Sequence, residues 1–248
     1  MKAFDIDFYG GSKQELIGEI VDTSTDSFSY IVTPNVNHVV QLEHDEGLKK
    51  AYDKARHRIC DSRVLLPFLR AANVHLEDAI PGSTLTEDLI KLADRHRWDV
   101  CVVGCEPENM ARLKDRFPGV TFHHYYPAMG FIKDERAVDA CIEYVARHPS
   151  RLVVLALGCT TQELLALKLL EAGNCKGVGL CVGGSLNFLA GAVPRAPKWV
   201  QQFSLEWLHR ICTEPKRLTG RYARDAVRFV PIMLRHLRQS TFTWGARQ

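Results

Sequence analysis

Short apolar segments alternate with amphipathic segments along most of the chain. Strands are expected at 30–35, 58–63, 98–107, 120–131, 151–158 and 176–184. Apolar residues recur at helical spacing in the stretches between them, at 36–55, 86–97, 108–119, 134–149 and 160–174. Thr86 stands at the start of the second of these helices and is expected to cap it. This alternation predicts an α/β fold, a Rossmann-like and mostly parallel sheet with helices on both faces.

The strand pattern stops near residue 192, and the rest of the chain is helical, basic and aromatic. We therefore expect a Rossmann-like catalytic domain at 1–191 and a basic helical C-terminal appendage of two to four helices at 192–248. The segment 194–248 holds eleven Lys or Arg and three Asp or Glu, a balance of +8, whereas the first 193 residues have a balance of −5. A basic tail on an acidic body indicates an anionic partner for the tail.

Four arginines of the tail follow one another at helical spacing. Arg217, Arg221, Arg224 and Arg228 are separated by four, three and four residues, so they share one face of a helix. Such a stripe suits water, a nucleic acid, a membrane surface or a phosphate-bearing substrate.

The cysteines and the lengths of the apolar runs indicate the cellular compartment of the protein. The eight cysteines include no Cys-x-x-Cys pair and lie mostly in apolar contexts, so we expect them to be buried and reduced, which favours the cytosol. The N-terminus has no signal-peptide core, and no apolar run approaches the ~20 residues that span a bilayer. Any membrane contact is therefore expected to be peripheral. The stretch 198–211 carries an apolar helical stripe that includes Trp199, Phe203 and Trp207, and it suits either packing on the body or lipid contact.

Small and polar residues follow the predicted strands, where ligands bind in sheets of this kind. These candidates are Thr33, Asn35, Asp61, Arg63, Gly104, Gly130, Gln162, Gly183, Gly184 and Asn187. No dinucleotide fingerprint follows the first strand, and no P-loop, hydrolase elbow or metal-ligand spacing occurs. Asp61 is the most suggestive acid, because a carboxylate at this edge can accept a proton from an attacking hydroxyl. It is equally a loop aspartate that caps a turn or pairs with Arg63.

The order of several motifs resembles the WecG/TagA/CpsF family of bacterial glycosyltransferases over roughly residues 25–230. The matching stretches are TPNVNHVV, CDSRVLLP, IPGSTL, VVGCEPENMARLKDRFPGV, LALGCTTQE and, most specific, FLAGAVPRAPKWVQQFSLEWLHRICTEPKRLTGRY. The resemblance implies a Rossmann-like domain with a helical appendage. It also implies inverting transfer of a sugar from a UDP-sugar to a polyprenyl-pyrophosphate-linked sugar at the inner face of the cytoplasmic membrane, in the biosynthesis of teichoic acid, common antigen, capsule or exopolysaccharide.

Residue by residue, the resemblance assigns roles to several positions. Asp61 falls on the proposed catalytic base, and Thr33 and Asn35 match a Thr-x-Asn at the active-site edge. Gln162 matches the glutamine of a Pro-Lys-Gln-Glu element. The arginines Arg217, Arg221 and Arg224 fall in a tail proposed to close over the donor.

The chain departs from the family pattern near these residues. Asp61 is followed by Ser-Arg instead of Gly-x-Gly, Ala79 replaces an arginine, and Thr84 replaces an aspartate. We expect Arg63 to supply a cation near the sugar or phosphate.

The expected partners follow from this reading. They are a UDP-sugar, a polyprenyl-pyrophosphate glycolipid and the membrane surface, with no nucleic acid and with homo-oligomers possible in the family. The arginine forks, rather than an Asp-x-Asp metal motif, are expected to stabilise the departing UDP, so no metal or other cofactor is expected. The sheet pattern alone also suits a nucleotide-binding oxidoreductase, and the basic tail alone suits a membrane or nucleic-acid scaffold.

Overall fold

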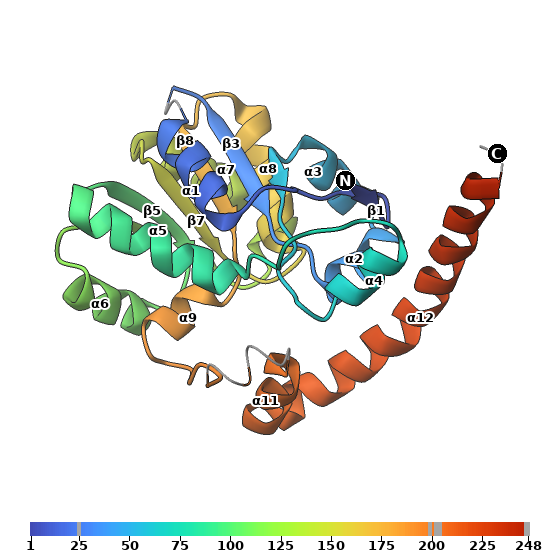
Figure 1. Ribbon diagram of the computed structural model, residues 1–248. Helices are drawn as coiled ribbons and strands as arrows, with labels where there is room; N and C mark the ends of the chain where they lie inside the picture. Colours follow the sequence, from blue (N-terminus) through green and yellow to red (C-terminus); the bar gives the residue numbers. More distant parts are fainter. Residues whose placement is uncertain (24–25, 198–199, 201–204, 246–248) are drawn as a thin grey trace.

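The core of the protein is a parallel sheet of six strands (Figure 1). The computed structural model describes residues 1–23, 26–197, 200 and 205–245. In spatial order the strands are β4 (His57–Arg58), β3 (Phe28–Val32), β8 (Gly177–Cys181), β7 (Leu152–Ala156), β5 (Asp99–Gly104) and β6 (Thr121–Tyr125). All neighbouring strands run parallel, so their carboxyl ends meet at one edge of the sheet. The predicted Rossmann-like α/β fold is confirmed.

Helices cover both faces of the sheet and enclose two apolar cores. One core is built with α1 (Lys13–Asp22), α5 (Gly82–His96), α6 (Pro107–Arg116) and α9 (Ser185–Leu189). The other is built with α2 (Val36–Leu42), α3 (Glu46–Lys54), α4 (Leu66–Ala71), α7 (Glu135–Arg147) and α8 (Thr161–Ala172). In β5 the side chains of Val100 and Val102 enter the first core, and those of Cys101 and Val103 enter the second. The continuous apolar run of this strand is thus explained by burial on both faces.

Two peripheral elements complete the fold. The N-terminal hairpin consists of β1 (Lys2–Ala3) and β2 (Ile6–Asp7), and a short 3₁₀ helix, η1, spans Phe131–Lys133. The tail contains α11 (Glu206–Thr213) and the long α12 (Pro215–Gly245), which runs along the outside of the body past α2 (Figure 1). Among the described residues, no helix has the length and apolar character to cross a membrane.

Aromatic and polar contacts hold α12 against the body. The ring of Phe229 packs on Phe4 and Phe68, with centroids 5.6 and 5.1 Å away. Asn37 of α2 donates through Nδ2 to the buried carboxylate of Asp225 at 3.1 Å. The α12 face that carries Asp225 and Phe229 is therefore buried, and the opposite face is left outside.

Two sequence expectations about local structure are wrong. The helix expected over 36–55 is two helices, because Asp45 caps α3 by accepting a hydrogen bond from the backbone of Leu48. Thr86 does not cap α5, which begins at Gly82; its buried hydroxyl donates instead to the Gly82 carbonyl. The short strand expected to run into a loop over 58–63 is confirmed, since β4 ends at Arg58 and a loop follows.

The expectation for the cysteines holds for six of the eight. These six are buried, whereas Cys159 and Cys212 are exposed, and all eight are free thiols. Cys159 lies just beyond the carboxyl end of β7, which places an accessible thiol at the functional edge of the sheet.

Candidate active site

The candidate residues from four separate strand ends come together at the carboxyl edge of the sheet. Thr33 follows β3, Asp61 follows β4, Gln162 opens α8 beyond β7, and Gly183 follows β8. The buried Thr33 joins two of these strands, because its hydroxyl donates to the carbonyl of Cys181 in β8 at 2.8 Å. The edge is thus a single site made of residues far apart in sequence.

Asp61 is held at the start of α5. Its Oδ1 accepts a hydrogen bond from the backbone N–H of Gly82 at 2.6 Å, and its own N–H donates to the Pro34 carbonyl at 3.0 Å. The positive end of a helix dipole stabilises an anion at this position. A Cβ on Gly82 would lie only 3.3 Å from Asp61 Oδ1 and from Thr33 Cγ2, so a residue without a side chain lets the helix come this close. Asp61 therefore also holds the start of α5 in place, through a hydrogen bond that joins residues 21 positions apart.

Asn35 connects Asp61 to α2. Its Oδ1 caps α2 by accepting from the N–H groups of Asn37 at 3.0 Å and His38 at 3.4 Å. Its Nδ2 lies 3.4 Å from Asp61 Oδ2. Among the described residues, the second oxygen of Asp61 therefore has only a long hydrogen bond from Asn35, in contrast to the short one that Oδ1 receives.

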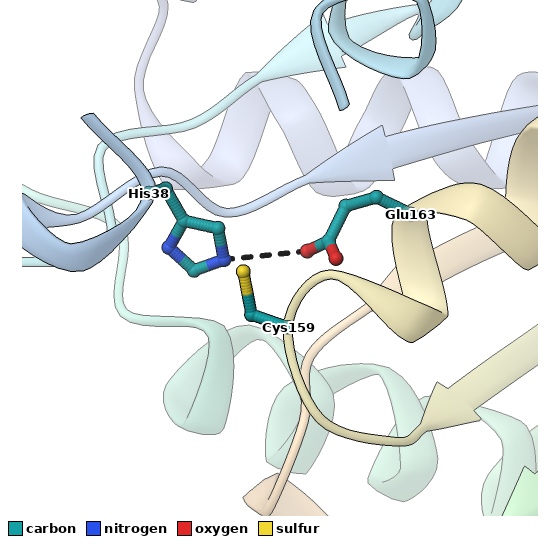
Figure 2. A group of neighbouring side chains, drawn as sticks. All are labelled: His38, Cys159 and Glu163. Carbon is teal, nitrogen blue, oxygen red and sulfur yellow. Dashed lines mark hydrogen bonds and ion pairs between the residues drawn. The ribbon is translucent and has the colours of Figure 1, made fainter. Parts of the chain in front are cut away.

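Gln162 and Glu163 are buried polar residues at the start of α8. Gln162 accepts from the Gly183 N–H at 2.8 Å and donates to Glu163 Oε1 at 2.8 Å. That carboxylate oxygen also lies 3.3 Å from His38 Nε2 (Figure 2). Burial lowers the pKa of His38, but Cys159 and Glu163 outweigh that effect and raise the pKa well above its usual value.

The sequence patterns missed His38 and Glu163 as site residues. His38 sits within an apolar helical run and Glu163 within a leucine-rich one, so both look like ordinary helix positions. The available signal was that each lies in the first turn of a helix that follows a strand, where side chains face the carboxyl edge.

Three of the four glycine candidates are described by their backbone positions. Gly104 has φ +91°, and a Cβ there would lie 2.5 Å from the Ala156 carbonyl oxygen, so the strand pairing itself demands glycine. Gly130 has φ +80° and precedes η1, and Gly184 precedes α9. Their part in ligand binding stays a prediction.

Arg63 forms an ion pair with Asp78. Its Nε and Nη2 lie 2.9 and 2.6 Å from the two oxygens of Asp78, a side-on ion pair. Asp78 raises the pKa of Arg63, and Arg63 in turn lowers the pKa of Asp78. Contact of Arg63 with a sugar or phosphate stays a prediction.

Of the tail arginines, Arg195 lies near the start of α5, and Arg221 and Arg224 belong to α12. Arg195 donates hydrogen bonds to Thr84 Oγ1 at 2.7 Å and to Glu87 Oε2 at 2.6 Å. Thr84 is the position where the family pattern has an aspartate. In the described part of the chain, the buried Nε of Arg221 has no hydrogen-bond acceptor, and its guanidinium lies 5.1 Å from the Tyr222 ring centroid. Arg224 is exposed.

Several residues expected to bind donor or lipid cannot be placed. Trp199 and Phe203 lie outside the described residues, and so does the side chain of Arg217. The described neighbours Trp207 and Leu208 of α11 have exposed fractions of 41% and 43%, so this part of the stripe is not buried on the body.

Comparison with known proteins identifies relatives of the chain. The sequence model of the family described as "Glycosyl transferase WecG/TagA/CpsF family" matches residues 1–242. A protein of Bacillus spizizenii named N-acetylglucosaminyldiphosphoundecaprenol N-acetyl-beta-D-mannosaminyltransferase is 31% identical over 169 residues, which cover 66% of this chain and 63% of that protein. The match thus spans less than two thirds of the relative's length.

The first prediction concerns the buried amide of Gln162. We expect Gln162→Leu to lower the free energy of unfolding by about 1–3 kcal/mol, because the Gly183 N–H loses its acceptor and Glu163 Oε1 keeps only the 3.3 Å contact with His38 Nε2 among the described residues. Urea unfolding followed by circular dichroism measures the effect. Gln14→Leu, at an exposed position of α1, is the control and should change the value by no more than about 0.5 kcal/mol. Equal effects of the two substitutions would show that the Gln162 amide does not organise the site.

Proposed function

The chain belongs to the glycosyl transferase WecG/TagA/CpsF family, and from that membership we propose that it transfers a sugar, with inversion, from a UDP-sugar to a polyprenyl-diphosphate-linked sugar. The name of the Bacillus spizizenii relative describes transfer of N-acetylmannosamine to such a lipid-linked acceptor. The product would be an intermediate of a cell-surface polysaccharide. The observation that carries the proposal is the unequal hydrogen bonding of the two Asp61 oxygens at the carboxyl edge of the sheet.

Asp61 is the general base of the proposed reaction. Its Oδ1 is occupied by the Gly82 N–H, whereas Oδ2 has, in the part of the chain that the structure describes, only the long contact with Asn35 and is the oxygen that accepts a proton. As the acceptor hydroxyl attacks the anomeric carbon, its proton moves to Oδ2 and the bond from that carbon to UDP breaks. Attack from the face opposite the leaving group inverts the configuration.

Arginines of the tail stabilise the departing UDP. The planar guanidinium matches phosphate oxygens, and its charge opposes the negative charge that grows on the diphosphate. Arg221 supports this role because its buried Nε has no acceptor among the described residues. Arg217 and Arg224 are the other cations that we assign to the donor. The chain does contain one Asp-x-Asp sequence, Asp5–Asp7, but Asp7 there pairs with the N-terminal amine at 2.6 Å.

The tail also contacts the membrane in this proposal. The outer face of α12 carries the exposed apolar side chains of Val227, Val230 and Leu234, and the exposed Arg228 lies to one side of this face. An apolar helical face with a basic residue beside it suits the interface of an anionic bilayer, and peripheral attachment there would bring the site close to its lipid-linked acceptor.

The second prediction tests the base. We expect Asp61→Asn to slow transfer by ~10²–10⁴-fold, because the amide keeps the shape of the carboxylate but cannot take the proton. UDP release is measured with a panel of UDP-sugars and a polyprenyl-diphosphate-linked N-acetylglucosamine acceptor, with and without EDTA. The exposed Asp53→Asn should retain the wild-type rate. Full activity of Asp61→Asn would remove Asp61 from the chemistry, and a rate that is lost in EDTA and restored by Mg²⁺ or Mn²⁺ would refute transfer without a metal at the diphosphate.

The third prediction tests the cation at the diphosphate. We expect Arg221→Ala to lower kcat/KM by at least about tenfold, the equivalent of 1.4 kcal/mol, because one charge-assisted hydrogen bond to phosphate is worth about 1.5–3 kcal/mol. Arg221→Lys should recover only part of the loss, since lysine lacks the planar fork. Arg112→Ala, on the exposed side of α6, is the control for loss of one positive charge. Equal rates for Arg221→Ala and Arg112→Ala would contradict the role.

The fourth prediction concerns lipid contact. Co-sedimentation with vesicles of anionic phospholipid should be at least about tenfold weaker for the double variant Val227→Glu, Val230→Glu, because burying one such side chain is worth about 1.5–3 kcal/mol. Met129→Glu places the same charge on a fully exposed apolar position of the body and should bind as the wild type does. Unchanged binding of the double variant would place the contact elsewhere.

A further inference from the structure

Three potential metal ligands from separate parts of the chain meet beside the proposed active site (Figure 2). His38 comes from the first turn of α2, Cys159 from the loop after β7, and Glu163 from the first turn of α8. One imidazole nitrogen, the thiol sulfur and one carboxylate oxygen all lie within 4.8 Å of one another. His38 and Glu163 are buried and Cys159 is exposed, so the group opens to solvent on one side.

The carboxylate of Glu163 is not satisfied by the protein groups described around it. Its side chain is completely buried. Gln162 donates to Oε1, and His38 Nε2 lies near the same oxygen, but Oε2 has no hydrogen-bond partner among the described residues. Burying a carboxylate with one oxygen unpaired costs free energy, and each such group in a native structure calls for an explanation. A cation among these three residues supplies one.

The imidazole of His38 is oriented for coordination through Nε2. Its Nδ1 lies 2.9 Å from Asn35 Oδ1, an oxygen that can only accept. Nδ1 also lies 3.4 Å from the backbone nitrogen of Asn35, but the shorter contact with Oδ1 favours a proton on Nδ1, which leaves the lone pair of Nε2 directed toward Cys159 and Glu163. Metal-binding histidines are fixed in this manner by a second hydrogen bond from the other ring nitrogen.

The donor set selects the kind of ion. One nitrogen, one sulfur and one oxygen suit Zn²⁺, which binds these atoms at about 2.0–2.3 Å, whereas Mg²⁺ and Ca²⁺ prefer oxygen alone. At those bond lengths a tetrahedral ion holds its ligands ~3.5 Å apart. The three atoms would therefore have to approach by little more than about 1 Å, and the exposed Cys159 side chain leaves room for that adjustment.

We propose that His38, Cys159 and Glu163 form a binding site for Zn²⁺ or a similar borderline-soft divalent ion, with the fourth coordination position open to water or an added ligand. The ion neutralises the buried carboxylate and ties the first turn of α2 to the first turn of α8. The site is additional to the proposed transfer chemistry, and it does not rest on that activity.

The site borders two residues of the candidate active site. Asn35 contacts His38 directly, and Gln162 contacts Glu163. A bound ion would therefore restrain the carboxamides of Asn35 and Gln162, the first of which lies against Asp61.

The fifth prediction is a direct measurement of metal binding. The full chain, treated with a chelator and then freed of it, is titrated with Co²⁺, which reports on tetrahedral sites through its visible bands and on thiolate ligands through a charge-transfer band. We expect one equivalent to bind with both signals, and Zn²⁺ to displace it. Absence of a saturable cobalt spectrum would overturn the proposal.

Substitutions identify the ligands. Cys159→Ser should abolish the charge-transfer band and weaken Zn²⁺ binding by more than the ~10–100-fold that loss of an outer-shell partner costs. Cys212→Ser, which removes the other exposed thiol, should change neither. Glu163→Gln should keep the thiolate band but weaken binding at least about tenfold. Retention of the band in Cys159→Ser, or unchanged affinity in Glu163→Gln, would overturn the assignment.

The competing explanation is that His38, Cys159 and Glu163 interact only with one another and bind no metal ion. In that case Zn²⁺ does not protect Cys159 from an alkylating agent. Protection of Cys159 by one equivalent of Zn²⁺ supports the metal site, and absence of protection overturns it. Circular dichroism is used to check that each variant is folded before its metal binding is compared.

Discussion

The carboxamide of Asn35 is the point on which the geometry of the site depends. Its oxygen caps α2 and its nitrogen faces Asp61, so the direction of a helix and the position of a carboxylate are set by the same group. The same oxygen lies against His38 Nδ1 and thereby directs the other ring nitrogen toward Glu163. A helix cap, which in most proteins only satisfies backbone N–H groups, here aligns two clusters of ionisable side chains.

The two carboxylates at this edge differ in their hydrogen bonds because they lie differently relative to the helix ends. Asp61 lies at the start of α5 and takes its strongest hydrogen bond from that helix. Glu163 lies inside the first turn of α8, in a completely buried position, and relies on side chains instead. One carboxylate therefore has an oxygen with a single long contact among the described residues, and the other has an oxygen that the described protein groups leave unpaired.

Much of the fold and part of the site were predictable from sequence. The apolar runs of β5, β7 and β8 and the amphipathic helices between them are strong local signals, and the parallel order makes their carboxyl ends converge. Thr33, Asp61 and Gln162 could be named because each follows a strand.

Other features depend on contacts that local sequence does not encode. The start of α5 at Gly82 is one, because it requires the close approach of Asp61, 21 residues earlier in the chain. The meeting of His38 with Glu163 joins residues 125 positions apart, and neither carries a recognisable spacing. The docking of α12 through Asp225 and Asn37 is equally non-local, since a lone aspartate in an arginine-rich helix looks like a solvated charge.

The position of α2 between the tail and the site has a thermodynamic consequence. Through Asn37 and Glu43 this helix holds Asp225 and Arg235 of α12, and at its first residues it adjoins Asn35. If occupancy of the site favours one placement of α2, it changes the docking equilibrium of α12 by some factor. Free-energy linkage then requires that whatever binds α12 change the affinity of the site by the same factor. In that case, binding at the tail and binding at the site affect each other by the same factor, and the seven-residue helix α2 connects them.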